Sequence, residues 1–309
     1  MAEAVPFLDA AAVTRATPMP ALIDALRAAF AGGDHAAPGR LAADMSETSS
    51  LLVMPAWRGT ASIGVKIAEI DRLRQPAVRA CYVLIDRATA RPRALLDGGA
   101  LTRRRTAAAS VLAATCLARR ESRRLLLIGT GALIAPLIEG YASHFPLDAI
   151  RIWGRDPAKA EAVAEVAREA GYPAQAVTDI DAALADCDIV SAATLSTVPL
   201  IRGTALHPGM HVDLIGAFRP EMCEADGAAI ERSLVYVDTI EGALHEAGDL
   251  IQAVASGHFA MDRIAGDLAD LCQGRFERGA QAITLFKSVG TAIEDLAAAE
   301  LAVRREGLA

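Results

Sequence analysis

The chain has 309 residues, of which 53% are hydrophobic and 22% are charged, and its formal net charge is −7. This length suffices for two lobes with cores of their own, and the acidic balance argues against nucleic acid or a membrane surface as partner. We therefore expect a small-molecule substrate. The N-terminus shows no secretory pattern, and no apolar run reaches the roughly 18 residues of a membrane span, so we expect a cytoplasmic protein.

The first third of the chain mixes helical and strand patterns. Residues 21–31 predict a helix. Three runs predict strands, separated by turns that contain proline or glycine: 50–54, 62–66 and 80–85. We expect a mixed α+β lobe here.

The middle of the chain alternates short apolar runs with amphipathic segments. The predicted strands are 124–128, 149–153, 189–192, 211–215 and 234–237. Residues 157–170 predict a helix, with Pro157 in its first turn. This alternation is typical of βαβ units and predicts a Rossmann-type, doubly wound parallel sheet of the α/β class. A last amphipathic helix, 291–305, should return to the first lobe, because a doubly wound lobe is complete without it.

A pair of glycines, Gly129 and Gly131, directly follows the first strand of this region. Glycine lets the backbone turn tightly there, so that a pyrophosphate can approach the N–H groups at the start of the next helix. We therefore expect a dinucleotide cofactor. Ile134 occupies the third position of the fingerprint, where Gly or Ala is usual, which predicts looser packing of helix on strand.

The end of the second strand bears on the choice of cofactor. An acidic residue there favours NADH, because it binds the ribose hydroxyls, and a basic residue favours NADPH. The chain has Arg155 followed by Asp156. Arg155 favours NADPH, and Asp156 leaves NADH open.

The cysteines and histidines predict neither disulfides nor a metal site. Five cysteines, odd in number and far apart, fit reduced thiols. His207 and His211 form the one close histidine pair, but Pro208 and Gly209 between them break the helix that ligation at this spacing would use. We predict no metal.

Six short segments together point to one family. They are Met54-Pro-Ala56, Gly64-Val-Lys66, the Leu101 to Ala108 stretch, Gly129-Thr-Gly131, Thr194-Leu-Ser-Thr-Val-Pro199 and the Phe286 to Asp295 stretch. Their order and spacing make the chain similar to the ornithine cyclodeaminase/mu-crystallin family from about residue 35 to the C-terminus.

The resemblance implies a substrate-binding and dimerisation domain built from both chain ends, 1–118 and 286–309, around an NAD(P)-binding Rossmann domain, 119–285. It implies a homodimer and a carboxylate-bearing amino acid or cyclic imine as substrate, held by Arg40, Lys66 and Arg105. The positions expected to bind the cofactor are Thr106, Gly129, Thr130, Gly131, Ala132, Leu133, Arg155, Thr194 and Ser196.

The residue types at these positions suit that chemistry. A guanidinium pairs bidentately with a carboxylate, and Arg105 is the expected clamp. The other two arginines of the run 103–105 are expected on a solvated face. Lys66 ends an apolar strand, where partial burial would lower its pKa and let it donate a proton or a hydrogen bond to the substrate.

One departure from the family pattern changes the expected reaction. Cyclodeaminases of this family carry a catalytic Asp where this chain has Phe218, and a phenylalanine cannot shuttle protons. Asp213, a strand residue, is not expected to replace it. We therefore predict an NAD(P)H-dependent reductase of cyclic ketimine carboxylates, such as Δ1-pyrroline-2-carboxylate or Δ1-piperideine-2-carboxylate. Phe218 would line the substrate and exclude water from the C=N bond.

Two alternatives remain open. One is an ornithine cyclodeaminase or an alanine-dehydrogenase-like enzyme, which would release ammonia from an amino acid. The other is a crystallin-like protein that binds the cofactor without significant turnover.

Overall fold

The computed structural model describes residues 4–71, 73–74 and 78–308. The chain divides into two compact units: Met1–Thr106 with Thr291–Ala309 (unit 1), and Ala107–Gly290 (unit 2). The sequence-based domain boundaries at residues 118 and 286 both fall within unit 2. A parallel sheet in one unit and a mixed sheet with helices in the other confirm the predicted α/β class with a second, α+β lobe.

Unit 1 is built on a mainly antiparallel sheet. Among the described residues its strand order is β1-β7-β6-β5-β4-β2, with β3 also paired to β4. The strands are β1 (Phe7–Leu8), β2 (His35–Ala36), β3 (Leu41–Asp44), β4 (Ser49–Arg58), β5 (Ser62–Asp71), β6 (Val78–Asp86) and β7 (Arg91–Asp97). The helices are α1 (Ala10–Ala16), α2 (Met19–Gly32), α11 (Ala292–Arg305) and the first half of α3 (Gly98–Leu117).

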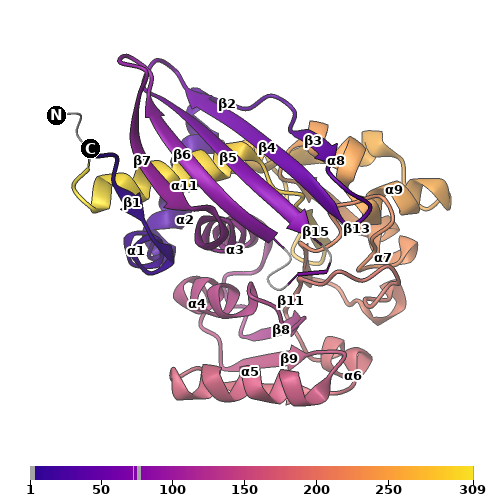
Figure 1. Ribbon diagram of the computed structural model, residues 1–309. Helices are drawn as coiled ribbons and strands as arrows, with labels where there is room; N and C mark the ends of the chain where they lie inside the picture. The colour runs from indigo at the N-terminus through magenta and orange to yellow at the C-terminus, as the bar shows by residue number, and fades with distance from the viewer. Residues whose placement is uncertain (1–3, 72, 75–77, 309) are drawn as a thin grey trace. The chain divides into compact units, whose positions relative to one another are not determined.

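One face of this sheet packs on helices. Side chains alternate along the central strands, so that Tyr82 and Leu84 of β6 are buried while Cys81 and Val83 lie on the other face. The last helix, α11, contacts β4, β5 and β6, and Figure 1 shows it in yellow behind these strands. Its N-cap is Thr291, whose side chain accepts a hydrogen bond from Ile293 N. The helix expected at 291–305 therefore belongs to unit 1.

Unit 2 is a doubly wound parallel sheet. Its order is β10-β9-β8-β11-β12-β15-β13-β14. The strands are β8 (Arg124–Ile128), β9 (Ala149–Trp153), β10 (Ala174–Val177), β11 (Ile189–Ala192), β12 (His211–Leu214), β13 (Ser233–Val237), β14 (Gly266–Asp267) and β15 (Ile283–Lys287). The helices are α4 (Ile134–His144), α5 (Pro157–Glu169), α6 (Ile180–Leu184), α7 (Gly227–Glu231), α8 (Ile240–Glu246), α9 (Gly248–Ala255) and α10 (Leu268–Cys272).

The predicted elements of unit 2 lie close to their expected places. The first strand, whose apolar residues 125–128 are fully buried, pairs with β9 on one side and β11 on the other. The α5 helix begins at Pro157 and buries alanines on one face: Ala160, Ala164 and Ala167. Three strands, β10, β14 and β15, were not predicted. Of these, β15 lies inside the sheet, between β12 and β13.

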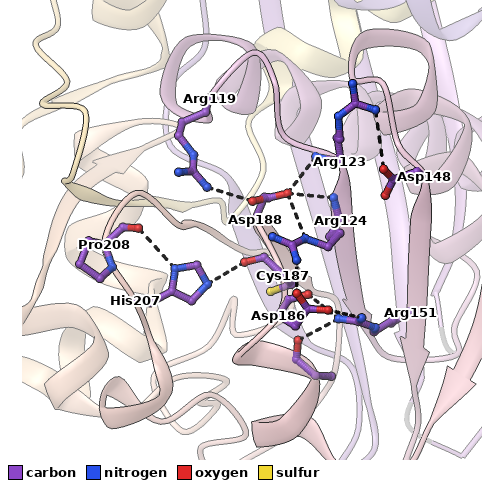
Figure 2. Close-up of polar contacts among 11 residues, drawn as sticks. Arg119, Arg123, Arg124, Asp148, Arg151, Asp186, Cys187, Asp188, His207 and Pro208 are labelled. Atoms are coloured by element: carbon purple, nitrogen blue, oxygen red, sulfur yellow. Dashed lines mark hydrogen bonds and ion pairs between the residues drawn. The ribbon is translucent and has the colours of Figure 1, made fainter.

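Arginines and aspartates join the amino ends of three strands of unit 2, as Figure 2 shows. Asp188 precedes β11 and accepts hydrogen bonds from the backbone N–H groups of Arg123 (2.9 Å) and Arg124 (3.0 Å). Asp186 pairs with Arg124 and with Arg151 of β9. Because these contacts lie at the amino edge of a parallel sheet, they are opposite the edge where such sheets bind ligands.

No helix in the described part of the chain is long and apolar enough to cross a lipid bilayer.

Candidate active site

A buried ion-pair cluster in unit 1 joins two residues predicted for the substrate to two that were not. Lys66 Nζ lies 2.6 Å from Asp295 Oδ2. Arg105 Nε lies 3.0 Å from Asp295 Oδ1, and its Nη1 lies 2.7 Å from Glu294 Oε2. All four side chains are at most 6% exposed. We call Lys66, Arg105, Glu294 and Asp295 the ion-pair cluster.

Three elements of unit 1 supply this cluster. Lys66 lies on β5 and points to the buried face of the sheet, directly opposite Tyr82 of β6. Arg105 lies on α3, and the two carboxylates lie in the first turn of α11. Gly64, two residues before Lys66, has no room for a side chain, because a Cβ there would overlap the Tyr82 hydroxyl. The Gly-Val-Lys segment thus brings the lysine and the tyrosine side by side.

The cluster's charges shift several pKa values. Burial lowers the pKa of Lys66 to about 8, with Arg105 and Arg40 acting in the same direction and Asp295 opposing them. Burial would also lower the pKa of Arg105, but Asp295 and Glu294 raise it above its usual value. For Asp295, burial acts to raise the pKa, and Arg105 and Lys66 outweigh it, so the carboxylate stays ionised.

Arg40 belongs to the same electrostatic environment. It lies just before β3, is half-buried, and contributes to the lowered pKa of Lys66. The structure thus brings together Arg40, Lys66 and Arg105, the three residues expected to hold a substrate. Lys66 and Arg105 pair directly with the two carboxylates, and Arg40 acts on Lys66 electrostatically, so positive charge is available here for an anionic ligand.

One of the two neighbouring arginines, Arg104, does not lie on the expected solvated face. Arg104 was expected on a solvated face, but it is only 5% exposed, and its Nε donates a hydrogen bond to Thr17 O over 3.1 Å. The reason is packing. Because α3 is buried on more than one face, the consecutive arginines on it cannot all point to solvent.

The glycine loop of unit 2 has the features of a pyrophosphate cradle. Gly129 has a φ of +129°, and a Cβ on it would lie 2.8 Å from the carbonyl oxygen of Ala193. The space beside Gly131 is open for at least 4 Å. At the start of α4, Leu133 is the N-cap and provides no side-chain hydrogen bond, so backbone N–H groups remain for an anion. These features fit a dinucleotide.

The other residues of this loop range from exposed to fully buried. Gly154, which directly follows β9, leaves room for Thr130, because a Cβ on Gly154 would lie 2.5 Å from Thr130 Cγ2. Ala132 is exposed, and Leu133 is half-buried. Ile134, at the third fingerprint position, is 1% exposed, so its larger side chain is accommodated within the core.

The two residues at the end of β9 have different surroundings. Asp156 is the N-cap of α5, and its Oδ1 accepts a hydrogen bond from Ala158 N over 3.0 Å. Arg155 is exposed. The acidic residue is thus engaged by the helix, and the basic one is open to a ligand.

The loops after β11 and β12 carry the remaining predicted residues of unit 2. Thr194 donates its hydroxyl proton to Glu224 Oε1 over 2.8 Å and accepts a hydrogen bond from Ser196 N over 3.3 Å. Phe218 is half-buried and packs against the apolar core of unit 2. Sequence reasoning did not find Glu224, because an isolated acidic residue in a loop gives no signal of burial.

Thr106, the remaining residue predicted for the cofactor, is buried on α3 in unit 1.

Asp213 is not available as a substitute acid at the surface of a site. It is fully buried in β12 and accepts hydrogen bonds from Ser110 (3.0 Å), Ser191 (2.5 Å) and Tyr141 (3.1 Å). Burial raises its pKa to about 6, against the effect of these three hydroxyls. Its surroundings are those of a structural carboxyl group.

The two close histidines of the sequence have separate partners. His207 Nε2 lies 2.9 Å from Cys187 O, and His211 Nδ1 lies 2.9 Å from Thr284 Oγ1. Burial lowers the pKa of His211 to about 3, so it stays neutral. The absence of a metal remains a prediction.

Comparison with known proteins places these features in a family. The family model described as "Ornithine cyclodeaminase/mu-crystallin family" matches residues 5–306, so the match begins before residue 35. A protein from Paracoccus denitrificans named Δ1-pyrroline-2-carboxylate reductase is 38% identical over 74% of this chain and 73% of its own. One of the same name from Colwellia psychrerythraea is 36% identical over 74% of each chain.

A solved structure supports the same assignment. It is the Thermococcus litoralis Δ1-pyrroline-2-carboxylate reductase in complex with NADH and L-proline, and it aligns with a TM-score of 0.93 at 27% identity, over 97% of each chain. The sequence match, the fold and the joint presence of the glycine loop and the ion-pair cluster agree. The chain belongs to the ornithine cyclodeaminase/mu-crystallin family.

Proposed function

We propose that this protein is an NAD(P)H-dependent reductase of cyclic ketimine carboxylates, of the Δ1-pyrroline-2-carboxylate or Δ1-piperideine-2-carboxylate type. The observation that carries the proposal is the ion-pair cluster. It places a buried lysine with a pKa of about 8 beside an arginine, so one cluster offers a proton and a carboxylate clamp. Relatives named Δ1-pyrroline-2-carboxylate reductase, at 38% and 36% identity, support it.

The reaction consumes one imine, one NAD(P)H and one proton, and yields a cyclic amino acid and NAD(P)⁺. When bound, the nicotinamide supplies the hydride to the imine carbon. Lys66 donates its proton to the imine nitrogen, and a pKa near neutrality suits this role because both protonation states are accessible. Asp295 holds the Lys66 ammonium in place and helps to keep it charged.

Arg105 binds the substrate carboxylate. A guanidinium has five N–H donors. The hydrogen bonds to Asp295 and Glu294 use one donor on Nε and one on Nη1, so these two bonds leave three donors, two of them on Nη2, for a substrate carboxylate. The two carboxylates fix the plane of the guanidinium before substrate binds, so less conformational freedom is lost on binding. Arg40 adds positive charge for the same anion.

Unit 2 binds the cofactor, and we propose that it prefers NADPH. The Gly129–Leu133 loop and the start of α4 receive the pyrophosphate. Arg155 is exposed at the end of β9, where it can pair with a ribose phosphate, whereas Asp156 is occupied as a helix cap. Phe218 supplies an apolar surface where deaminating relatives have an acid, and this favours reduction of an existing imine over release of ammonia.

We also propose a homodimer that forms through unit 1. The face of the sheet opposite α11 carries apolar side chains on adjacent strands, paired across the sheet as Pro55 with Val65, and Val65 with Val83. Most of these side chains are partly exposed, and Trp57 and Ile67 are 38% and 45% exposed. A continuous apolar face of this kind marks an interaction surface. The expected cytoplasmic location stays a prediction.

The test is oxidation of cofactor by the purified protein. Each of the two imines is supplied with NADPH and with NADH, and loss of absorbance is followed from acid to alkaline pH. We expect turnover with at least one imine and faster turnover with NADPH. Ammonia release from ornithine or alanine with NAD(P)⁺ is measured in parallel. The proposal fails if neither imine supports oxidation of either cofactor at any pH.

A further inference from the structure

A buried carboxylate in unit 2, Glu224, ties together two loops that carry predicted cofactor and substrate residues. Its Oε1 accepts hydrogen bonds from Thr194 N (2.7 Å) and Thr194 Oγ1 (2.8 Å), and its Oε2 accepts one from Gly216 N (2.6 Å). Thr194 follows β11 and Gly216 follows β12, and these strands are neighbours in the sheet. One side chain therefore sets the distance between the two loops.

The loops are packed tightly on each other around this carboxylate. A Cβ on Gly216 would overlap the carbonyl oxygen of Thr194, so only glycine allows this approach. The backbone of Glu224 is itself anchored: its N–H donates to Asp249 Oδ1 over 2.6 Å, and its carbonyl accepts from Leu200 N and Ile201 N. The carboxylate is thus held at a fixed position beneath both loops.

The place of these loops in the sheet gives them a role. In doubly wound folds, ligands bind at the carboxyl ends of the strands, where the strand order reverses. Here the order reverses between β8 and β11, whose following loops contain Gly129 and Thr194. These loops are in contact, because a Cβ on Gly129 would lie 2.8 Å from the carbonyl oxygen of Ala193. Glu224 therefore fixes one side of the crevice.

The groups around Glu224 partly offset the cost of burying its carboxylate. Lys287, at the end of β15, is fully buried, and its Nζ lies 3.1 Å from Asp249 Oδ2. Burial raises the pKa of Glu224 to about 7, with Asp249 acting in the same direction and Lys287 opposing both. A buried carboxylate with three donors and a nearby ammonium is far better stabilised than an isolated one.

We propose that Glu224 is a positioning residue for cofactor binding: it holds the Thr194–Ser196 and Gly216–Phe218 loops at the spacing that the nicotinamide end of the dinucleotide requires. The inference rests on the proposed function, because it takes unit 2 as the dinucleotide-binding unit. Glu224 also fixes the Thr194 hydroxyl as a donor to the carboxylate, so that Ser196 N can bond to the same oxygen.

The test compares Glu224→Gln with a matched variant at the other edge of the sheet. Gln keeps the shape of the side chain but removes its charge and replaces one acceptor by a donor. Asp188→Asn is the control, because Asp188 also accepts two backbone N–H groups and a side-chain donor, Arg119 Nη2 at 2.9 Å. It lies at the amino ends of the strands among the arginines that Figure 2 shows, whereas Thr194 and Gly216 follow the carboxyl ends of β11 and β12.

Three quantities are measured for both variants. The Kd of NADPH and of NADH, from fluorescence titration without substrate, should rise about tenfold for Glu224→Gln and stay within about twofold for Asp188→Asn. The KM for the imine should also rise in Glu224→Gln, because the Gly216–Phe218 loop carries the proposed substrate-lining Phe218, and it should change little in Asp188→Asn. Hydrogen exchange of the Thr194 and Gly216 amides in the cofactor-free protein should accelerate in Glu224→Gln alone.

Each outcome decides the proposal. The proposal is overturned if the exchange of the two amides is unchanged in Glu224→Gln, or if its cofactor Kd is unchanged. It is also overturned if cofactor binding weakens equally in Glu224→Gln and Asp188→Asn. If Glu224→Gln does not fold, Glu224→Asp serves, because it keeps the charge but is one methylene too short to reach both loops. A wild-type protein that binds neither cofactor would refute the proposed function instead, and the exchange measurement would still judge whether Glu224 orders the loops.

Discussion

Asp295 holds the ammonium of Lys66 at 2.6 Å, and both side chains are almost completely buried. Burial lowers the pKa of Lys66 to about 8, and Asp295 limits this fall by stabilising the charged form. If Lys66 donates the proton, imine reduction needs the protonated lysine. The rate of reduction should then fall about tenfold per pH unit above pH 8, because the protonated fraction falls by that factor. The measurement is kcat/KM for the imine against pH.

In Asp295→Asn, the fall of kcat/KM at alkaline pH should begin about one pH unit lower than in the wild type. The substitution removes a negative charge that favours protonated Lys66. The amide oxygen can still accept from Arg105, so the clamp keeps its position. Glu69→Gln is the matched control: it lies on the same strand and pairs with Arg79 at the surface, where ion pairs contribute little. If kcat/KM of Asp295→Asn falls at the same alkaline pH as that of the wild type, Lys66 is ruled out as the titrating proton donor.

Cofactor preference should depend on Arg155. An arginine paired with a phosphate contributes roughly 1.5 to 3 kcal/mol, so Arg155→Ala should raise the KM for NADPH by about ten- to a hundredfold and leave that for NADH nearly unchanged. The comparison of kcat/KM for the two cofactors, in wild type and variant, measures this. A parallel Arg168→Ala, at an exposed arginine on α5 that pairs with Glu161, should change neither value. Equal effects on both cofactors would argue against a phosphate contact.

The fold was largely predictable from sequence because its signals are local. The first strand of unit 2, Arg124–Ile128, and the helix that begins at Pro157 have the expected periodicity and caps. The strand at Ile283–Lys287 was missed for a physical reason. It is buried, follows a segment without helical periodicity, and joins the middle of the sheet as the last strand in the chain, so its pairing depends on topology.

The candidate site was predictable only in part. Lys66, Arg105 and the glycine loop have types and positions that indicate their chemistry. Asp295 does not: it lies 229 residues from Lys66 in the chain, and an acid in the first turn of an amphipathic helix is normally read as a partner of the helix dipole. Glu224 gives even less signal. Both act through partners that are distant in sequence, and only the folded chain brings these together.

Phe218 should separate reduction from deamination. Phe218→Asp places a charge on an aromatic position that packs against the core of unit 2, so it should lower kcat for imine reduction at least tenfold. Phe218→Leu keeps the position apolar and should retain most of the activity. Ammonia release from ornithine should be undetectable in wild type and in Phe218→Leu. Substantial ammonia release by the wild type, increased in Phe218→Asp, would favour the deaminase alternative.

The apolar face of unit 1 should govern the oligomeric state. Val65 lies at its centre, paired with Pro55 on one side and Val83 on the other. Val65→Glu would bury an unpaired charge in the proposed interface, which is strongly unfavourable, so the dimer should dissociate to monomers at micromolar concentration. Val166→Glu is the control, because Val166 is a 62% exposed valine on α5 of unit 2. Sedimentation velocity distinguishes the two species. If the wild type is monomeric, or if both variants dissociate alike, this face is not the dimer interface.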